Sequence, residues 1–200
     1  ERIKEYPLIL IGADLNKKAL ESAKINLDLK NINCHFLISD ISNPDQFQKD
    51  LQSKFNIDMT ELLHVRSFLD HNRIYMDARK YKKSQNLTSS CAYSHKGEHL
   101  NSSKITSNLI YHFDSWKPHI KKHGLILLEL HGLFLALSQK NKMLTPTVAY
   151  ESTHGYSDQY IVEYDIFLEC AKIAGLDRIK KYTKVYPNDK LVTVSLNLFR

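Results

Sequence analysis

The sequence has few cysteines, no long hydrophobic run and no strong excess of charge. Its three cysteines, Cys34, Cys91 and Cys170, are far apart and odd in number, so we expect reduced thiols in a cytoplasmic protein and neither a disulfide framework nor a structural zinc site. The longest apolar runs, "LILIGA" and "GLILLEL", are too short to span a bilayer, and no signal peptide is visible. A membrane is therefore not an expected partner.

The formal net charge of +6 is modest, and lysine and arginine are spread along the chain, as in "NKK", "RKYKK" and "IKK". Such spacing indicates a solvated surface, so nucleic acid is not an expected partner either. A length of 200 residues predicts one domain over 1–200 with a core of its own. The chain has no initiating Met and opens almost directly on an apolar run. We interpret it as a piece from which a preceding segment is missing.

Apolar runs and helical patterns alternate along the chain, which predicts an α/β fold. Strands are predicted at 6–15, 33–41, 61–71 and 125–132, with a final antiparallel pair at 177–188 and 190–199. Helices are predicted at 16–31, 42–55, 102–118 and 157–175, the last with Ser157 or Asp158 near its N-cap and Gly175 beyond its end. The polar region 72–104 is predicted to be a mobile loop or lid.

Polar residues stand where four of the predicted strands end, and ligands bind at the carboxyl ends of strands in open α/β sheets. A carboxylate suits a ribose because a vicinal diol offers two donors, so Asp14 is a candidate for the ribose and Asp40 for the adenine amino group. Both acids could instead merely cap the helices that follow. The strand ends in question carry Asp14, Asp40, Asp70 with His71, and Glu129 with His131.

The stretches "LILIGADLNKKALESAKINL", "HFLISDISNP" and "KPHIKKHGLILLELHG" resemble class I S-adenosylmethionine-dependent methyltransferases over nearly the whole chain. The resemblance implies a Rossmann-like, mostly parallel sheet with an antiparallel final strand. It also implies that S-adenosylmethionine lies against Asp14, Leu15, Asp40 and Ile41. The family's first strand and glycine-rich loop should precede residue 1 and are absent, so either they were lost from this fragment or cofactor binding is incomplete.

Three further stretches, "LHVRSFLDHNR", "LLELHGL" and "YESTHGYSDQYIVE", resemble the metal-dependent C-methyltransferase domains of polyketide synthases and related stand-alone proteins. This resemblance implies methyl transfer to the acidic carbon of a malonyl-type or β-keto acyl thioester. The acceptor would be a small molecule or an acyl group delivered by an acyl carrier protein.

The chemistry of such an acceptor is consistent with a metal. A carbon between two carbonyls becomes nucleophilic only as an enolate, and a bound cation can hold both oxygens and stabilise the charge. The predicted metal ligands are Asp70, His154 and Gln159, a set that suits iron or manganese better than structural zinc, with magnesium as a further candidate. The alternative for His154 and Gln159 is an ordinary polar start of a helix.

His71 and His131 are candidates for a general base or a further ligand. Arg66, and with it Arg73, could hold an acyl carboxylate or a phosphopantetheine phosphate, although surface salt bridges are an equal alternative. We interpret five other histidines as surface or packing residues: His95, His99, His112, His119 and His123.

Two other functions remain open. The first is a metal-independent O- or N-methyltransferase that acts on a small molecule. No Asn/Asp-Pro-Pro-aromatic motif follows the third strand, which disfavours methylation of DNA bases or protein glutamine. The second is a degenerate, non-catalytic methyltransferase fold that serves as a module inside a larger protein, and the missing glycine-rich loop is its best support.

Overall fold

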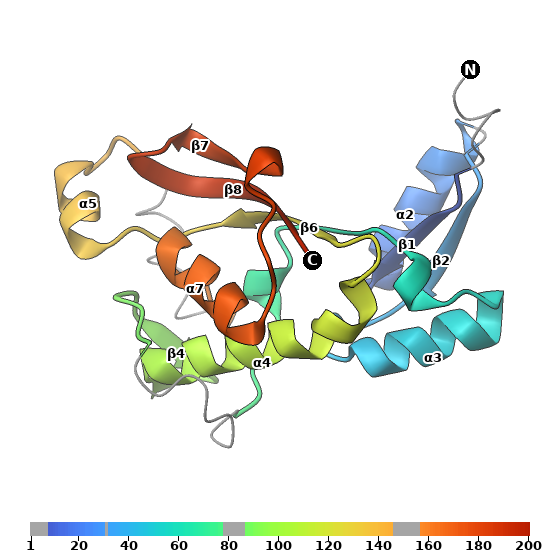
Figure 1. Ribbon diagram of the computed structural model, residues 1–200, viewed down its shortest axis with the longest axis horizontal. Coiled ribbons are helices and arrows are strands. Elements are labelled where there is room, and N and C mark those ends of the chain that lie inside the picture. Colours follow the sequence, from blue (N-terminus) through green and yellow to red (C-terminus); the bar gives the residue numbers. More distant parts are fainter. Residues whose placement is uncertain (1–7, 31, 78–86, 146–156) are drawn as a thin grey trace. The chain divides into compact units, whose positions relative to one another are not determined.

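A computed structural model describes residues 8–30, 32–77, 87–145 and 157–200 (Figure 1). The chain forms two compact units, residues 1–59 and residues 60–200. Strands and helices alternate in both units, and parallel and antiparallel pairs occur in the larger one. The prediction of an α/β fold is therefore confirmed. The larger sheet is mixed rather than mostly parallel, because one of its described strand pairs is parallel and two are antiparallel. No helix in the described part of the chain is long and apolar enough to cross a membrane.

The first unit is a strand-helix-strand-helix segment built on two parallel strands. It consists of β1 (Leu10–Asp14), α2 (Lys17–Asp28), β2 (Cys34–Ile38) and α3 (Pro44–Phe55). Asp14 lies opposite Ile38 in the register. The side chain of Asn16 accepts hydrogen bonds from the first turn of α2, and that of Asn43 accepts one from the first turn of α3. Asparagine therefore caps both helices.

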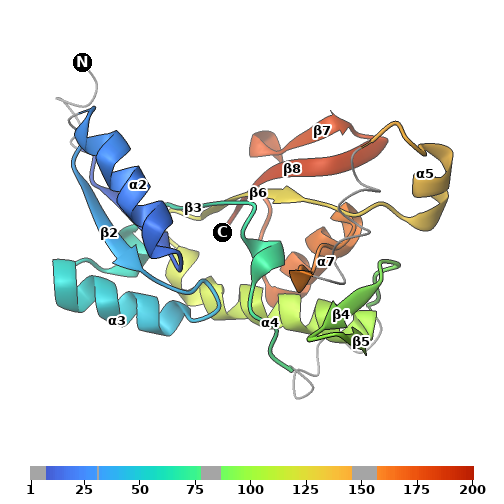
Figure 2. The ribbon, with the colours of Figure 1, turned by 180° about the vertical axis from the view of Figure 1, so that it is seen from behind.

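The second unit is organised on a four-stranded sheet with the order β3-β6-β8-β7 (Figure 2). β3 runs parallel to β6, whereas β8 runs antiparallel to both of its neighbours. From the end of the first unit, the elements in chain order are η1 (Met59–Glu61), β3 (His64–Ser67), η2 (Asp70–Asn72), β4 (Tyr93–His95), β5 (Glu98–Leu100), α4 (Ser102–Ile120), β6 (Leu125–Leu130), α5 (Leu135–Lys140), α7 (Tyr164–Ala174), η4 (Lys180–Tyr182), β7 (Lys184–Asn188) and β8 (Leu191–Phe199).

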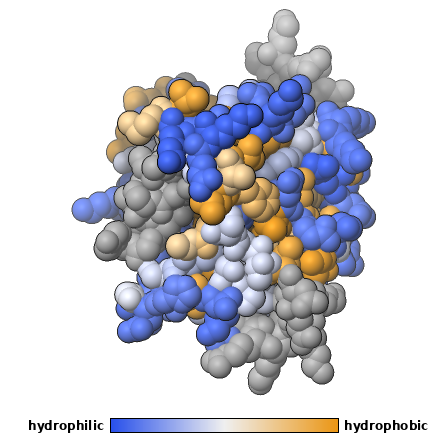
Figure 3. All heavy atoms as spheres, turned by 90° about the vertical axis from the view of Figure 1, so that its left-hand side faces the viewer, coloured by the Kyte–Doolittle hydropathy of each residue, from blue (hydrophilic) through white to orange (hydrophobic). Residues whose placement is uncertain are grey.

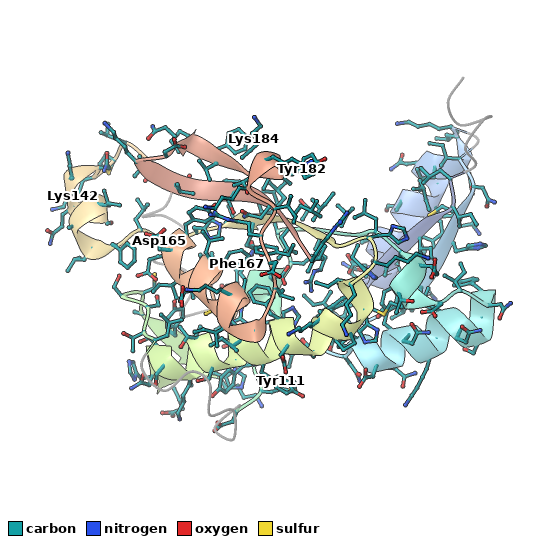
Figure 4. All side chains as sticks on the ribbon, in the orientation of Figure 1. Tyr111, Lys142, Asp165, Phe167, Tyr182 and Lys184 are labelled. Carbon is teal, nitrogen blue, oxygen red and sulfur yellow. The ribbon has the colours of Figure 1, made fainter. Side chains whose placement is uncertain are left out.

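Helices α4 and α7 cover one face of this sheet (Figure 1). The ring of Phe167 from α7 lies 5.4 Å from that of Phe113 and 6.1 Å from that of Phe199. Phe167 points between α7 and the sheet, whereas Tyr111 points outward from α4 (Figure 4). Side chains of β6 alternate between this core and the other face, with Leu125 and Leu127 buried. The alternation also turns Glu129 into the core.

Helix α5 contrasts with α4 and α7, because none of its residues is buried. Leu135, Met143 and Leu144, in and after this helix, are exposed. The side of the molecule that carries α5 shows hydrophobic residues among hydrophilic ones (Figure 3). α5 is therefore a surface helix that contributes little to the core.

The predicted start of the last helix is wrong. α7 begins at Tyr164 with Glu163 as its N-cap, so neither Ser157 nor Asp158 caps it. Residues 160–163 are instead held by other parts of the unit: the Tyr160 amide donates to the His71 carbonyl (2.8 Å), and the Gly132 amide donates to the Val162 carbonyl (3.1 Å). These tertiary bonds replace the helical bonds that the local sequence favours.

Three other boundaries differ from the prediction. β3 ends at Ser67, so Asp70 and His71 lie in the short turn η2 beyond it. Within the region 72–104, residues 93–100 form the antiparallel hairpin β4–β5. Pro118 does not end α4, which continues to Ile120. The predicted C-terminal glycine is confirmed, since Gly175 adopts the left-handed conformation after α7.

Gly124, which links α4 to β6, is predicted to tolerate no side chain. It has φ +95°, and a Cβ atom there would lie 2.6 Å from the Phe199 carbonyl oxygen. Gly97 has φ +83° but open space around it, so it provides a matched control. We expect Gly97→Ala to cost about 1 kcal/mol of unfolding free energy, and Gly124→Ala about 1–3 kcal/mol more. Urea unfolding of both variants measures the difference, and equal losses would show that the clash relaxes freely.

Candidate active site

Asp14 and Asp40 lie near one another at the carboxyl ends of the two strands of the first unit. Asp14 ends β1 and Asp40 follows β2, and the Ser39 amide donates to the Asp14 carbonyl (3.1 Å). Asp14 Oδ1 accepts from the Asn16 amide, and Asp40 Oδ1 accepts from the Ser42 amide, each at 2.7 Å. Neither acid caps a helix, because Asn16 and Asn43 do. The alternative of a mere capping role is therefore wrong.

The residues that follow these acids also lie on this edge. Leu15 has an exposed side chain, and Ile41 is half-buried. A carboxylate has about four lone-pair positions, and each of the two acids uses only Oδ1 in the bond to its own turn. Their second oxygens suit a ribose diol or an amino group, and an apolar neighbour suits an adenine ring. The roles of Asp14, Leu15, Asp40 and Ile41 in cofactor binding stay predictions.

Asp70, in the second unit, is a buried carboxylate with two basic neighbours. Arg66 Nη2 lies 3.3 Å and His112 Nε2 3.0 Å from Asp70 Oδ1. Burial by itself would raise the pKa of Asp70, but Arg66 and the hydrogen bond with His112 outweigh it and hold that pKa below its usual range. Burial lowers the pKa of His112 to about 4. Asp70 is therefore an ionised carboxylate held beside a neutral imidazole.

Arg66 and Arg73 point into this unit. The guanidinium of Arg66 stacks on Trp116 at 4.5 Å from the ring centre. Arg73 donates from Nε to Asn108 Oδ1 (2.7 Å) and from Nη1 to the Asp70 carbonyl (2.8 Å). Both residues are buried, so the alternative of surface salt bridges is wrong. Their contacts favour a role in holding the Asp70 turn over a role in binding an acyl group.

His71 and Glu129 form the closest contact between ionisable groups on this side of the sheet. His71 Nδ1 lies 2.6 Å from Glu129 Oε1, which also accepts from the Leu130 amide (2.7 Å). Glu129 Oε2 accepts from the amides of Asp70 (2.9 Å) and His71 (3.2 Å). The carboxylate thus fixes both the imidazole and the turn that carries it. With Nδ1–H donated to Glu129, the lone pair of neutral His71 is on Nε2, where it can accept a proton.

A small cavity of about 10 Å³ adjoins this pair. Its polar lining comes from Asp70, His71, Arg73, Glu129 and Tyr160. Leu109, Leu130, Ile161, Val162 and Phe167 complete the wall. A volume of this size holds roughly one water molecule, so the buried groups at the end of β6 are tightly enclosed.

His131 is a core residue. Its side chain is fully buried, Nε2 lies 2.7 Å from Ser195 Oγ, and its ring packs against those of Tyr164 and Phe167 at 5.1 Å. Burial lowers the pKa of His131 to about 3. These contacts favour packing over the predicted role of His131 as a general base or further ligand.

Acid is predicted to destabilise the fold through His112 and His131. Their folded-state pKa values lie below the ordinary 6.5, so below that pH the unfolded chain binds protons that the folded chain does not. Stability should fall by up to about 1.4 kcal/mol per pH unit for each histidine as the pH drops from 6.5 toward 4. Urea unfolding at pH 7 and pH 5 should show a smaller loss for His131→Gln than for wild type. The exposed control His99→Gln should keep the full loss, and equal losses in all three would contradict the assignment.

The structure describes two of the three predicted metal ligands, Asp70 and Gln159. Asp70 lies in η2, and half-buried Gln159 immediately precedes Tyr160, whose amide donates to the His71 carbonyl. The chain near Gln159 thus approaches the Asp70 turn, and the role of Gln159 as a ligand stays a prediction. His154 lies outside the described residues. Within 8–30, 32–77, 87–145 and 157–200, no group of three His, Cys, Asp or Glu side chains is placed to hold a metal ion.

Two residues of this site were missed. Glu129 was noticed only as a polar strand end, and His112 was interpreted as a surface or packing residue. A signal for Glu129 exists in "LILLELHG", since the alternation that buries Leu125 and Leu127 also buries the acid. A buried acid requires partners. His112 carries no comparable signal, because its partner Asp70 comes from a distant part of the chain.

The alternating order, the mixed sheet and the acids at the strand ends are those of a methyltransferase of the α/β class. The chain matches the family of AprA MT2-like methyltransferase domains over residues 1–197, and it belongs to that family. The resemblance to methyltransferase domains of the polyketide-synthase type is thereby confirmed. A search of the curated proteins found no match.

Proposed function

We propose that the protein transfers a methyl group from S-adenosylmethionine to the acidic carbon of a malonyl-type or β-keto acyl thioester, with His71 as the general base. The observation that supports this most directly is the His71–Glu129 contact of 2.6 Å at the ends of β3 and β6. A carbon between two carbonyls needs a base before it can attack. A buried imidazole fixed by a carboxylate is suited to that step.

In the proposed step, which requires the enclosed cavity beside His71 to open to the acceptor, His71 Nε2 removes the proton from the acceptor carbon. Glu129 stabilises the imidazolium that forms and keeps its ring oriented. With S-adenosylmethionine bound, the electron pair released on the acceptor carbon would form the carbon–carbon bond to the methyl group, while the carbon–sulfur bond would break with its electrons on sulfur. S-adenosylmethionine, when bound, supplies an activated methyl group on a sulfonium.

Asp14 and Asp40 are the residues that would hold this cofactor. Each keeps one carboxylate oxygen beyond the bond to its own turn, and no helix needs either acid as a cap. The donor set of a nucleoside, two hydroxyls and an amino group, fits two such carboxylates.

The proposal also includes a divalent metal ion that assists the reaction. Asp70 supplies an ionised carboxylate, and the chain near Gln159 approaches the turn that carries it. Iron, manganese or magnesium bound there would stabilise the enolate oxygens. Elemental analysis of the purified, untagged protein tests this part. A stoichiometric metal that is lost in Asp70→Asn would support it, and full activity in metal-free buffer with chelator would overturn it.

Incubation of the full-length protein with methyl-labelled S-adenosylmethionine and a malonyl or β-keto acyl thioester tests the main proposal. Mass spectrometry should find the label on the carbon between the carbonyls. The same acyl group should be tried free and on an acyl carrier protein, which we propose as a partner in the cytoplasm. Label on oxygen or nitrogen would favour the alternative, a small-molecule O- or N-methyltransferase. No transfer and no cofactor binding would favour a non-catalytic module.

A further inference from the structure

The hairpin β4–β5 is hydrogen-bonded to the chain segment that borders the His71 turn. The Tyr93 hydroxyl donates to the Ile161 carbonyl (2.7 Å), and the Lys96 amide donates to Asp158 Oδ1 (3.1 Å). His95 Nδ1 lies 2.8 Å from the Tyr160 hydroxyl. Because the Tyr160 amide in turn donates to the His71 carbonyl, a continuous chain of bonds joins His95 to the candidate base.

Two groups compete for the same nitrogen of His95. The Tyr160 hydroxyl lies 2.8 Å from Nδ1, within hydrogen-bond distance, and Asp158 Oδ1 lies 3.8 Å from it. Burial, followed by the charge of Asp158, raises the pKa of Tyr160 to about 12, so the phenol keeps its proton and can donate to a neutral imidazole. A protonated imidazole has no lone pair on Nδ1, and a carboxylate accepts from it more strongly than a phenol does.

The surroundings of His95 favour such a change of partner. Glu98 pairs with His95 across the hairpin, so both side chains lie on one face of it. The Tyr75 ring lies 5.1 Å from that of His95. Arg73, the cation on this side, lies over the Tyr160 ring at 5.7 Å from its centre. The acids beside His95 are thus Asp158, at 3.8 Å, and Glu98, opposite it in the hairpin.

We propose that His95 is a positioning residue for the His71 turn: in its neutral form it holds the Tyr160 hydroxyl, and on protonation it turns to Asp158 and releases the Tyr160 segment. The turn is thus held firmly while His95 is neutral and loosened once His95 is protonated. The consequence for catalysis rests on the proposed function, because it assumes that His71 is the base. The exchange of partners itself does not depend on that assumption.

Amide hydrogen exchange of the peptide 160–162 in the full-length protein, at pH 8 and pH 5.5 and corrected for intrinsic exchange, tests the proposal. Protection in wild type should fall about 3- to 10-fold at pH 5.5, the effect of one hydrogen bond. His95→Gln should keep the same protection at both pH values, because glutamine can bond to Tyr160 but cannot be protonated. Asp158→Asn should show a smaller fall than wild type. His99→Gln, an exposed histidine of the same hairpin, should behave as wild type.

An equal fall in wild type and His95→Gln would overturn the proposal, as would a loss of the effect in His99→Gln. Methyl transfer provides a separate readout. If the exchange results are as expected but no methyl transfer is found in any variant, the proposed function fails while the role of His95 stands. If transfer occurs and its pH profile is the same in wild type and His95→Gln, His95 does not position the catalytic turn.

Discussion

His71→Ala is expected to lower kcat for methyl transfer by about 10²- to 10⁴-fold, the usual contribution of a general base. The reason is the placement of the imidazole, whose Nδ1 is fixed 2.6 Å from Glu129 while Nε2 remains the nitrogen that can accept a proton. KM for the acyl thioester should change little, since the proposed role is in the chemical step. Steady-state kinetics across pH, with circular dichroism to verify the fold, measures the effect.

His99→Ala provides the matched control for this experiment. His99 is exposed on β5, and its replacement should leave kcat unchanged. A His71→Ala variant that is folded and as active as wild type would remove His71 from the mechanism. A more acidic acceptor, which ionises without help, should recover part of the lost rate in His71→Ala and thereby distinguish a missing base from a distorted site.

Asp14→Ala is expected to weaken binding of S-adenosylhomocysteine by about 10- to 150-fold, equivalent to the loss of about 1.5–3 kcal/mol for a charged hydrogen-bond acceptor. Asp14 Oδ1 bonds to the Asn16 amide, so the second oxygen is the one predicted to meet the ribose. Calorimetry on the full-length protein measures the affinity.

Asp28→Ala is a suitable control, because Asp28 is an exposed acid at the far end of α2. It should bind S-adenosylhomocysteine as wild type does. Unchanged affinity in Asp14→Ala would contradict the cofactor assignment. Absence of binding in wild type as well would count against an S-adenosylmethionine-dependent enzyme altogether.

The parts of the fold that the sequence predicted are those where local pattern and tertiary structure agree. The apolar run before Asp14, the helix after it and the strand before Asp40 carry clear patterns, and each forms as expected. The hairpin β4–β5 was missed because its three-residue strands lie in a polar stretch without a run of alternation. The start of α7 was misplaced because residues 160–163 bond to His71 and Gly132, which no local pattern reveals.

The sequence predicted several residues of the candidate site but not which of them pair with one another. Polarity at strand ends pointed to Asp14 and Asp40 in the first unit and to Asp70 and His71 in the second, because ligands bind where strands end. Which of these groups would pair could not be predicted. Besides the nearby Arg66, Asp70 pairs with His112, more than forty positions away in the sequence, and His71 pairs with Glu129. Such pairs depend on how α4 and β6 pack, which is determined by the whole core.

Glu129 accepts four N–H groups, three from the backbone and one from His71. Its loss would leave buried donors without partners, each at a cost of about 1–3 kcal/mol, whereas the loss of the His71 ring removes only one of the four bonds. Position 129 is therefore constrained by the stability of the fold, whereas position 71 is constrained mainly by the proposed catalysis. A related protein that lost methyl transfer but kept the fold could replace the histidine at a smaller cost in stability than the acid. A family member with glutamate at position 129 but no histidine at position 71 would thus be one that has lost methyl transfer.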